Sequence, residues 1–136
     1  MKPEHNLWQQ VKRNNKRVVW TRIESNTGLG IPDLFGFYIR PFWVELKIIR
    51  NNKLLFSPHQ ISWIHKHYNI GCPVFVLAKD PLTGSIRLYP GAIVRDPSSI
   101  ADKPPLWDSK HGTWPQLQEL LGTWRAPSPV KSTDLH

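Results

Sequence analysis

The most informative segment of the chain is residues 31–49, which read IPDLFGFYIRPFWVELKII. Its β-branched and aromatic residues are typical of β-strands, and Arg40 and Pro41 interrupt the run near its middle. We therefore predict two strands, over residues 33–39 and 42–49. A β-hairpin or a tight turn at Arg40 and Pro41 would join them.

The second of these strands carries two charges on one face. Glu45 and Lys47 are two residues apart, and alternate residues of a strand point to the same side of a sheet. Because burial of unpaired charges is costly, such a pair requires a solvent-facing sheet, a mutual ion pair or a ligand that uses both groups.

A hairpin would also bring Asp33 close to Glu45. Two neighbouring carboxylates repel each other unless a cation lies between them, and oxygen ligands suit Mg²⁺ or Mn²⁺. We therefore expect a metal site with Lys47 beside it. The reaction class that this arrangement favours is metal-assisted hydrolysis of a phosphodiester.

Periodicity and turn residues predict the elements on either side of this hairpin. Ser57 has the features of a helix N-cap, with Pro58 at the first helical position and Gln60 placed to close a capping box. The predicted elements are a helix over 6–14, a strand over 17–24, a Gly-rich loop over 25–32, a helix from Ser57 to Gly71, and strands over 72–79 and 85–89.

The C-terminal part of the chain has weaker patterns. Residues 97–115 contain four prolines and no clean periodicity, whereas residues 114–124 favour one more short helix. We expect an α/β core over residues 1–96 and an irregular, Pro- and Trp-rich extension over 97–136 that packs on or near the core and ends in a flexible tail.

The charge is concentrated in the N-terminal half. The 136 residues carry a formal charge of +8 and are 40% apolar, which excludes a disordered tail or a coiled coil. Residues 1–70 hold 11 Lys or Arg and 4 acids, and no acid occurs between His5 and Ile23. This basic stretch, interleaved with Trp8 and Trp20, favours a surface that faces phosphates, although a solvated basic face without a partner would have the same composition. Its basic residues are Lys12, Arg13, Lys16, Arg17 and Arg22.

The single cysteine, Cys72, cannot form an internal disulfide, and the N-terminal residues lack the apolar stretch of a secretory signal. The apolar runs are also far shorter than the roughly 20 residues of a membrane helix. We expect a soluble, cytoplasmic protein without a membrane segment.

Pro32-Asp33, followed after eleven residues by Glu45-Leu46-Lys47, resembles the motif of the PD-(D/E)XK nucleases. The core of that family has the order α-β-β-β-α-β, with a central mixed sheet flanked by helices. The elements predicted between Leu7 and Ala78 follow this order, so the resemblance covers about 75 residues. Within the family, the chain looks like the branch that contains archaeal-type Holliday junction resolvases and VRR-NUC-like phage nucleases.

The resemblance assigns a role to each motif residue. It implies that Asp33 and Glu45 bind the metal together with the main-chain carbonyl of Leu46, that Lys47 is the catalytic lysine, and that Gln60 is an auxiliary residue of the active site. An additional acid would be Glu24 as first choice and Glu4 as second. Structural alternatives exist: Gln60 could only close the capping box, Glu24 could pair with Arg22 or Lys16, and Asp33 could form an Asx-turn.

The function that the resemblance implies is a Mg²⁺-dependent, structure-selective endodeoxyribonuclease similar to a Holliday junction resolvase. The alternatives are a VRR-NUC-like flap or single-strand nuclease and a non-catalytic nucleic-acid-binding module. Backbone contacts would come from the basic stretch together with Arg50, Lys53 and Ser57. Symmetric cutting of a junction requires two sites, so we expect a homodimer, formed through exposed Trp residues and the apolar C-terminal helix. For a phage protein the location would be the host cytoplasm.

Overall fold

The computed structural model describes residues 3–23 and 28–127. The order α-β-β-β-α-β from the first helix to the fourth strand is confirmed. The described elements are α1 (Pro3–Asn14), β1 (Val19–Arg22), β2 (Leu34–Tyr38), β3 (Arg40–Ile48), α2 (Pro58–Asn69), β4 (Val74–Lys79), β5 (Ile86–Pro90), the 3-10 helices η1 (Gly91–Arg95) and η2 (Ile100–Asp102), β6 (Trp107–Asp108) and α3 (Trp114–Thr123).

The strands form one mixed sheet in the order β1-β2-β3-β4-β5-β6. The central pair, β3 and β4, is parallel and is connected through α2, whereas every other neighbouring pair is antiparallel. A parallel pair requires a long crossover, and α2 supplies it. The chain is therefore an α/β protein, as its patterns predict.

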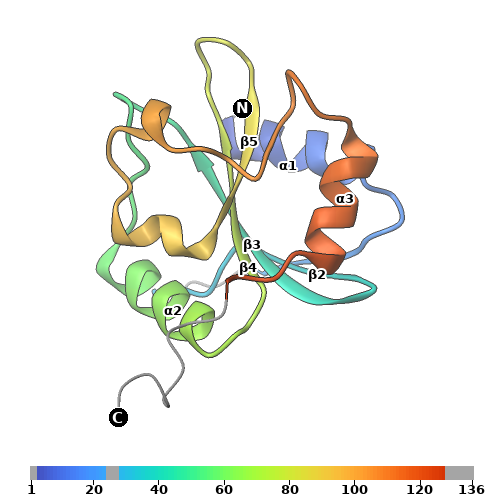
Figure 1. The fold of residues 1–136 in the computed structure, drawn as a ribbon, viewed down its shortest axis with the longest axis horizontal. Helices are drawn as coiled ribbons and strands as arrows, with labels where there is room; N and C mark the ends of the chain where they lie inside the picture. The colour runs from blue at the N-terminus through green and yellow to red at the C-terminus, as the bar shows by residue number, and fades with distance from the viewer. Residues whose placement is uncertain (1–2, 24–27, 128–136) are drawn as a thin grey trace.

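Helices cover both faces of the sheet (Figure 1). Alternate residues of β3, such as Val44 and Leu46, join Leu7 and Val11 of α1 in a core that also includes α3. On the other face, Ile64 of α2 packs with residues of β4 and η1. The side chains of Glu45 and Lys47 therefore belong to the α2 face, because they alternate with the residues that face α1.

The turn of the hairpin lies one residue earlier than predicted. Ile39, with φ of 68°, connects β2 to β3, and Pro41 pairs with Phe37 inside the ladder. The main-chain N–H of Trp43 donates to Pro73 on the β4 side. Because residues two apart on a strand direct their N–H groups to the same side, an N–H at Pro41 would also point toward β4. Since β4 begins only opposite Trp43, Pro41 has no partner strand on that side and removes no hydrogen bond from the sheet.

The first strand is shorter than the predicted 17–24, because the main-chain N–H of Val18 closes a turn with the carbonyl of Asn15. The side chain of Asn15 also bonds back to Val11 at the end of α1. Glu24 and the start of the predicted Gly-rich loop, residues 25–27, lie outside the described residues.

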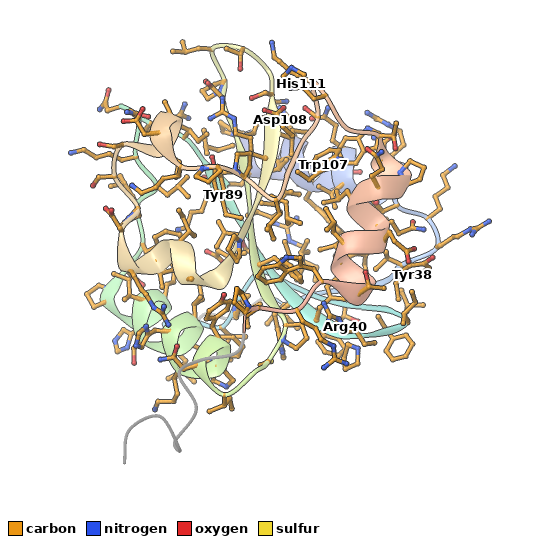
Figure 2. The ribbon with its side chains drawn as sticks, viewed as in Figure 1. Tyr38, Arg40, Tyr89, Trp107, Asp108 and His111 are labelled. Carbon is orange, nitrogen blue, oxygen red and sulfur yellow. The ribbon has the colours of Figure 1, made fainter. Side chains whose placement is uncertain are left out.

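Residues 97–115 are not wholly irregular, because they contain η2 and β6, and β6 extends the sheet next to β5. Trp107 of β6 is buried on the α3 side, where its indole N–H donates to the carbonyl of Thr113 at 2.9 Å (Figure 2). Leu117 and Leu121 of α3 are buried in the same core as α1. The C-terminal segment is thus continuous with the core of residues 1–96.

This packing bears on the expected dimer surface. The apolar face of α3 covers the sheet, and each of the seven tryptophans is buried or half-buried. Leu117 and Leu121 of α3 therefore face the core, and the homodimer itself stays a prediction. In the part of the chain that the structure describes, no helix has the length and apolar character needed to cross a membrane.

Candidate active site

The register of the hairpin brings the two motif carboxylates together. Leu34 pairs with Val44, so Asp33, one residue before β2, lies opposite Glu45. The main-chain N–H of Asp33 donates to Glu45 Oε1 at 3.1 Å, and that of Leu46 donates to Asp33 Oδ2 at 3.0 Å. Two reciprocal bonds therefore fix the carboxylates beside each other at the point where β2 and β3 diverge.

Gln60 connects this pair to the motif lysine. Its side-chain N–H₂ donates to Glu45 Oε2 at 2.8 Å, and its Oε1 accepts a hydrogen bond from Lys47 Nζ at 2.9 Å. Lys47 Nζ also lies 3.5 Å from Glu45 Oε2. The structure thus brings Asp33, Glu45, Lys47 and Gln60 into one cluster built from the residue before β2, from β3 and from the first turn of α2.

The capping alternative for Gln60 is also present. The main-chain N–H of Ser57 donates to Gln60 Oε1 at 2.9 Å, and Ser57 Oγ accepts from the Gln60 N–H at 3.2 Å. The predicted capping box is confirmed. Because Gln60 Oε1 accepts from both Ser57 and Lys47, the helix cap and the contact with the lysine share one atom.

Gly30 holds the loop before Asp33 against the start of α2. Its φ is +80°, and a Cβ at this position would lie 2.2 Å from the carbonyl oxygen of His59. Only glycine satisfies both conditions at low cost. The loop and the first turn of α2 therefore approach each other closely on the side of the sheet where Gln60 meets Glu45.

Phe56 is a member of this neighbourhood that the motif does not include. Its ring centre lies 4.8 Å from Lys47 Nζ. The ring adds a cation–π contact and restricts the directions from which water can reach the ammonium. The only signal in the sequence is its position directly before the N-cap Ser57.

Burial controls the protonation of Glu45, whose side chain is only 3% exposed. Removal from water and the negative charge of Asp33 raise the pKa of Glu45 to about 8, against the opposing effect of Lys47. Two carboxylates in this arrangement favour either a shared proton or a bound cation.

The donor set fits a hard divalent cation. Asp33 and Glu45 supply carboxylate oxygens, and the carbonyl of Leu46 faces the Asp33 side of β3, since the N–H and C=O of one strand residue point to the same neighbour. Among residues 3–23 and 28–127, no group of three or more His, Cys, Asp or Glu side chains is assembled. Glu24 lies outside the described residues, and Glu4 is exposed in the first turn of α1, outside the cluster.

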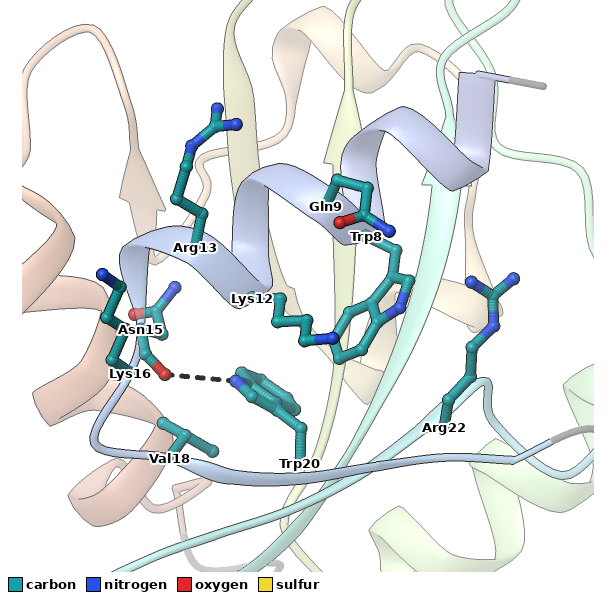
Figure 3. Close-up of a pocket in the computed structure, with 9 residues that line it drawn as sticks. All are labelled: Trp8, Gln9, Lys12, Arg13, Asn15, Lys16, Val18, Trp20 and Arg22. Atoms are coloured by element: carbon teal, nitrogen blue, oxygen red, sulfur yellow. Dashed lines mark hydrogen bonds between the residues drawn. The ribbon is translucent and has the colours of Figure 1, made fainter. Parts of the chain in front are cut away.

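Four of the eight predicted DNA-contacting residues surround a hollow of about 710 Å³ between α1 and β1. Trp8 and Trp20 line it together with basic side chains, whereas neither Asp33 nor Glu45 does (Figure 3). The basic residues of this hollow are Lys12, Arg13, Lys16 and Arg22.

The other four predicted DNA-contacting residues do not line the hollow. One of them, Arg17, is exposed, and the remaining three lie elsewhere on the surface. Arg50 and Lys53 lie on an exposed turn that follows β3, where main-chain hydrogen bonds join them. Ser57 caps α2 beside Gln60. The sequence therefore identified a basic surface, but not its division into a hollow and a separate turn.

No protein-family model, curated protein or solved structure matches this chain.

Proposed function

We propose that this protein is a divalent-metal-dependent endonuclease of the PD-(D/E)XK type that hydrolyses phosphodiester bonds in DNA. The observation that supports the proposal is the contact of Gln60 with both Glu45, at 2.8 Å, and Lys47, at 2.9 Å, next to Asp33. These four polar side chains come from a loop, a strand and a helix, and from positions up to 27 residues apart. A lone ion pair on a solvent-facing sheet would not require this convergence.

Asp33, Glu45 and the carbonyl of Leu46 would hold the metal, and a bound Mg²⁺ or Mn²⁺ lowers the pKa of its water and offsets charge on the phosphate in the transition state. Lys47, whose side chain is 16% exposed, would use its ammonium to bind a phosphate oxygen or to orient the attacking water. Gln60 holds Lys47 and Glu45 in their relative positions.

We propose branched DNA as the substrate. The charge of +8 favours a phosphate backbone, and the described residues form one sheet with its covering helices, without a separate module for reading bases. Selection by shape is therefore a better fit than selection by sequence. A four-way junction would additionally require a two-fold dimer with two sites.

The proposal is tested by cleavage of end-labelled four-way junction, flap, single-stranded and duplex DNA in Mg²⁺ or EDTA. We expect Mg²⁺-dependent cutting that Lys47→Ala abolishes while DNA binding persists. Paired nicks confined to the junction would support a dimeric resolvase, and preferential cutting of flaps or single strands would support the alternative nuclease. DNA binding without any Mg²⁺-dependent cutting would overturn the enzyme proposal.

A second experiment tests the metal site without DNA. Mg²⁺ binding should raise the free energy of unfolding, by about 2.7 kcal/mol at a concentration 100 times Kd. Asp33→Asn should remove this shift, whereas Asp102→Asn, which changes an exposed carboxylate in η2, should retain it. Equal Mg²⁺ shifts in both variants would contradict the assigned ligands.

A further inference from the structure

The hollow between α1 and β1 combines a basic rim with aromatic walls (Figure 3). Four of its nine described lining residues are Lys or Arg, and none of the nine is acidic. All four basic side chains are exposed. Its volume of about 710 Å³ lies within the range of ligand pockets. The hollow is therefore suited to a ligand that carries both negative charge and a flat ring.

The aromatic walls are held in fixed orientations. The Trp8 and Trp20 rings meet edge to face, with their centres 5.9 Å apart, and the indole N–H of Trp20 donates to the carbonyl of Asn15 at 3.2 Å. Lys12 Nζ lies 5.7 Å from the centre of the Trp8 ring. Trp8 is only 7% exposed whereas Trp20 is half-buried, so a ring that enters the hollow would contact mainly the Trp20 indole, with Lys12 nearby. Because this indole is already fixed in orientation, less entropy is lost on binding.

The hollow adjoins the candidate active site through β1. Arg22, on its rim, pairs with Leu34, and the main-chain N–H of the next residue, Ile23, donates to the carbonyl of Asp33 at 2.7 Å. Asp33 and Glu45 are on the opposite face of the sheet from α1. A DNA strand that contacts both the hollow and the candidate active site would therefore pass around the β1 edge of the sheet. The path is short, because Arg22 and Asp33 belong to neighbouring chain segments that are hydrogen-bonded to each other.

We propose that this hollow binds an unpaired nucleotide from a single-stranded segment of the DNA substrate, with its base against the Trp20 indole and its phosphates on Lys12, Lys16 and Arg22. A base in a duplex remains stacked on its neighbours and cannot present its ring to these walls, whereas a base in a single strand can. The inference rests on the proposed nuclease function and favours a flap or single-stranded substrate over a fully paired junction.

Binding is measured in EDTA with the Lys47→Ala protein, so that no cutting occurs. The probes are a labelled twelve-nucleotide oligothymidine, an abasic oligonucleotide of equal length, a twelve-base-pair duplex and free thymidine monophosphate. We expect the oligothymidine to bind about tenfold more tightly than the abasic strand, since stacking of one base typically contributes that much or more. Free monophosphate should bind weakly because it lacks the flanking phosphates.

Two sets of variants separate the contributions of ring and charge. Trp20→Ala should abolish the difference between oligothymidine and abasic strand, and Trp20→Phe should retain most of it. Lys12→Gln with Lys16→Gln should weaken binding of both strands and reduce the salt slope of log K by about 0.7 for each lost phosphate contact. The matched control is Lys66→Gln with Lys110→Gln, two exposed lysines outside the hollow, which should change neither quantity.

Equal affinity for oligothymidine and abasic strand, or identical effects of the two lysine pairs, would overturn the proposal. Tighter binding of the duplex, or of the free monophosphate, would also overturn it. If Trp20→Ala fails to fold, the Trp20→Phe and lysine comparisons still test the roles of ring and charge. Base-dependent binding by a protein that never cuts DNA with Mg²⁺ would support nucleotide binding in the hollow and reject the nuclease function. Mg²⁺-dependent cutting without base-dependent binding would support the nuclease function and reject nucleotide binding in the hollow.

Discussion

Gln60 Oε1 accepts hydrogen bonds from Lys47 Nζ and from the main-chain N–H of Ser57, both at 2.9 Å. The atom that closes the cap of α2 is therefore also the atom that orients the motif lysine. A change at Gln60 should affect both helix stability and the chemistry of the cluster, and α3 offers an internal comparison. Its capping box, formed by Thr113 and Gln116, has the same bonds, and no lysine of the described residues donates to Gln116 Oε1.

Gln116→Ala should lower the free energy of unfolding by about 0.5–1 kcal/mol, because it removes one capping interaction. Gln60→Ala should lower it further, because it also removes the hydrogen bond to the buried Glu45 carboxylate. Only Gln60→Ala should also reduce kcat, by about tenfold or more, as expected when a residue that orients a catalytic group is lost. Urea denaturation and cleavage assays on both variants provide the measurement. Equal kcat in the two variants would show that Gln60 acts as a cap alone.

The raised pKa of Glu45 makes stability depend on pH. Without metal, the folded state retains a proton that the unfolded chain loses near pH 4.5, so the free energy of unfolding should fall as pH rises toward about 8. The slope is at most about 1.4 kcal/mol per pH unit. Glu45→Gln should flatten this profile, and Mg²⁺ should also flatten it by stabilising the charged form.

This pH dependence is measured by urea denaturation in EDTA between pH 5 and pH 9. Glu119→Gln, at an exposed carboxyl on α3, is the control and should retain the wild-type slope. If Glu45→Gln and wild type show parallel profiles, Glu45 does not hold the additional proton.

Gly30→Ala should be much more destabilising than Gly28→Ala. Both residues have positive φ, which costs about 1 kcal/mol or more with a side chain, but only the Gly30 Cβ would collide with the His59 carbonyl. We expect a total cost of about 3 kcal/mol or more at Gly30, or displacement of the loop from α2. The cleavage rate and the urea midpoint of both variants are the readouts. A similar loss in the two variants would rule out the close approach as the cause.

The C-terminal helix should unfold together with the sheet. Leu117 is fully buried among residues of α1 and β3, so Leu117→Ala should lower the free energy of unfolding by about 2–5 kcal/mol. Leu82→Ala, at a side chain 93% exposed, should change it by less than about 0.5 kcal/mol. A single urea transition that shifts only in the first variant is the expected result. An unchanged Leu117→Ala midpoint would mean that α3 is not part of the cooperative core.

Local patterns were enough to predict several features of this protein. Alternation of charge and apolar residues predicted that Glu45 and Lys47 share a face of β3, and Ser57, Pro58 and Gln60 predicted the start of α2. These features depend on strand period and on hydrogen bonds between residues three apart. Both operate over a few residues, so they can be read directly from the chain.

Long-range packing determined the rest. The contact of Gln60 with Glu45 depends on how α2 crosses the sheet, and the use of Leu117 and Trp107 as core depends on which apolar surface lies nearest. The Pro-rich segment carries no periodic signal, yet β6 pairs with β5 because the sheet offers it an open edge. The enclosure of Trp8 and Trp20 by four basic side chains likewise depends on the angle between α1 and β1. Composition can identify the charges and rings, but their arrangement around one hollow follows from tertiary contacts between segments distant in the chain.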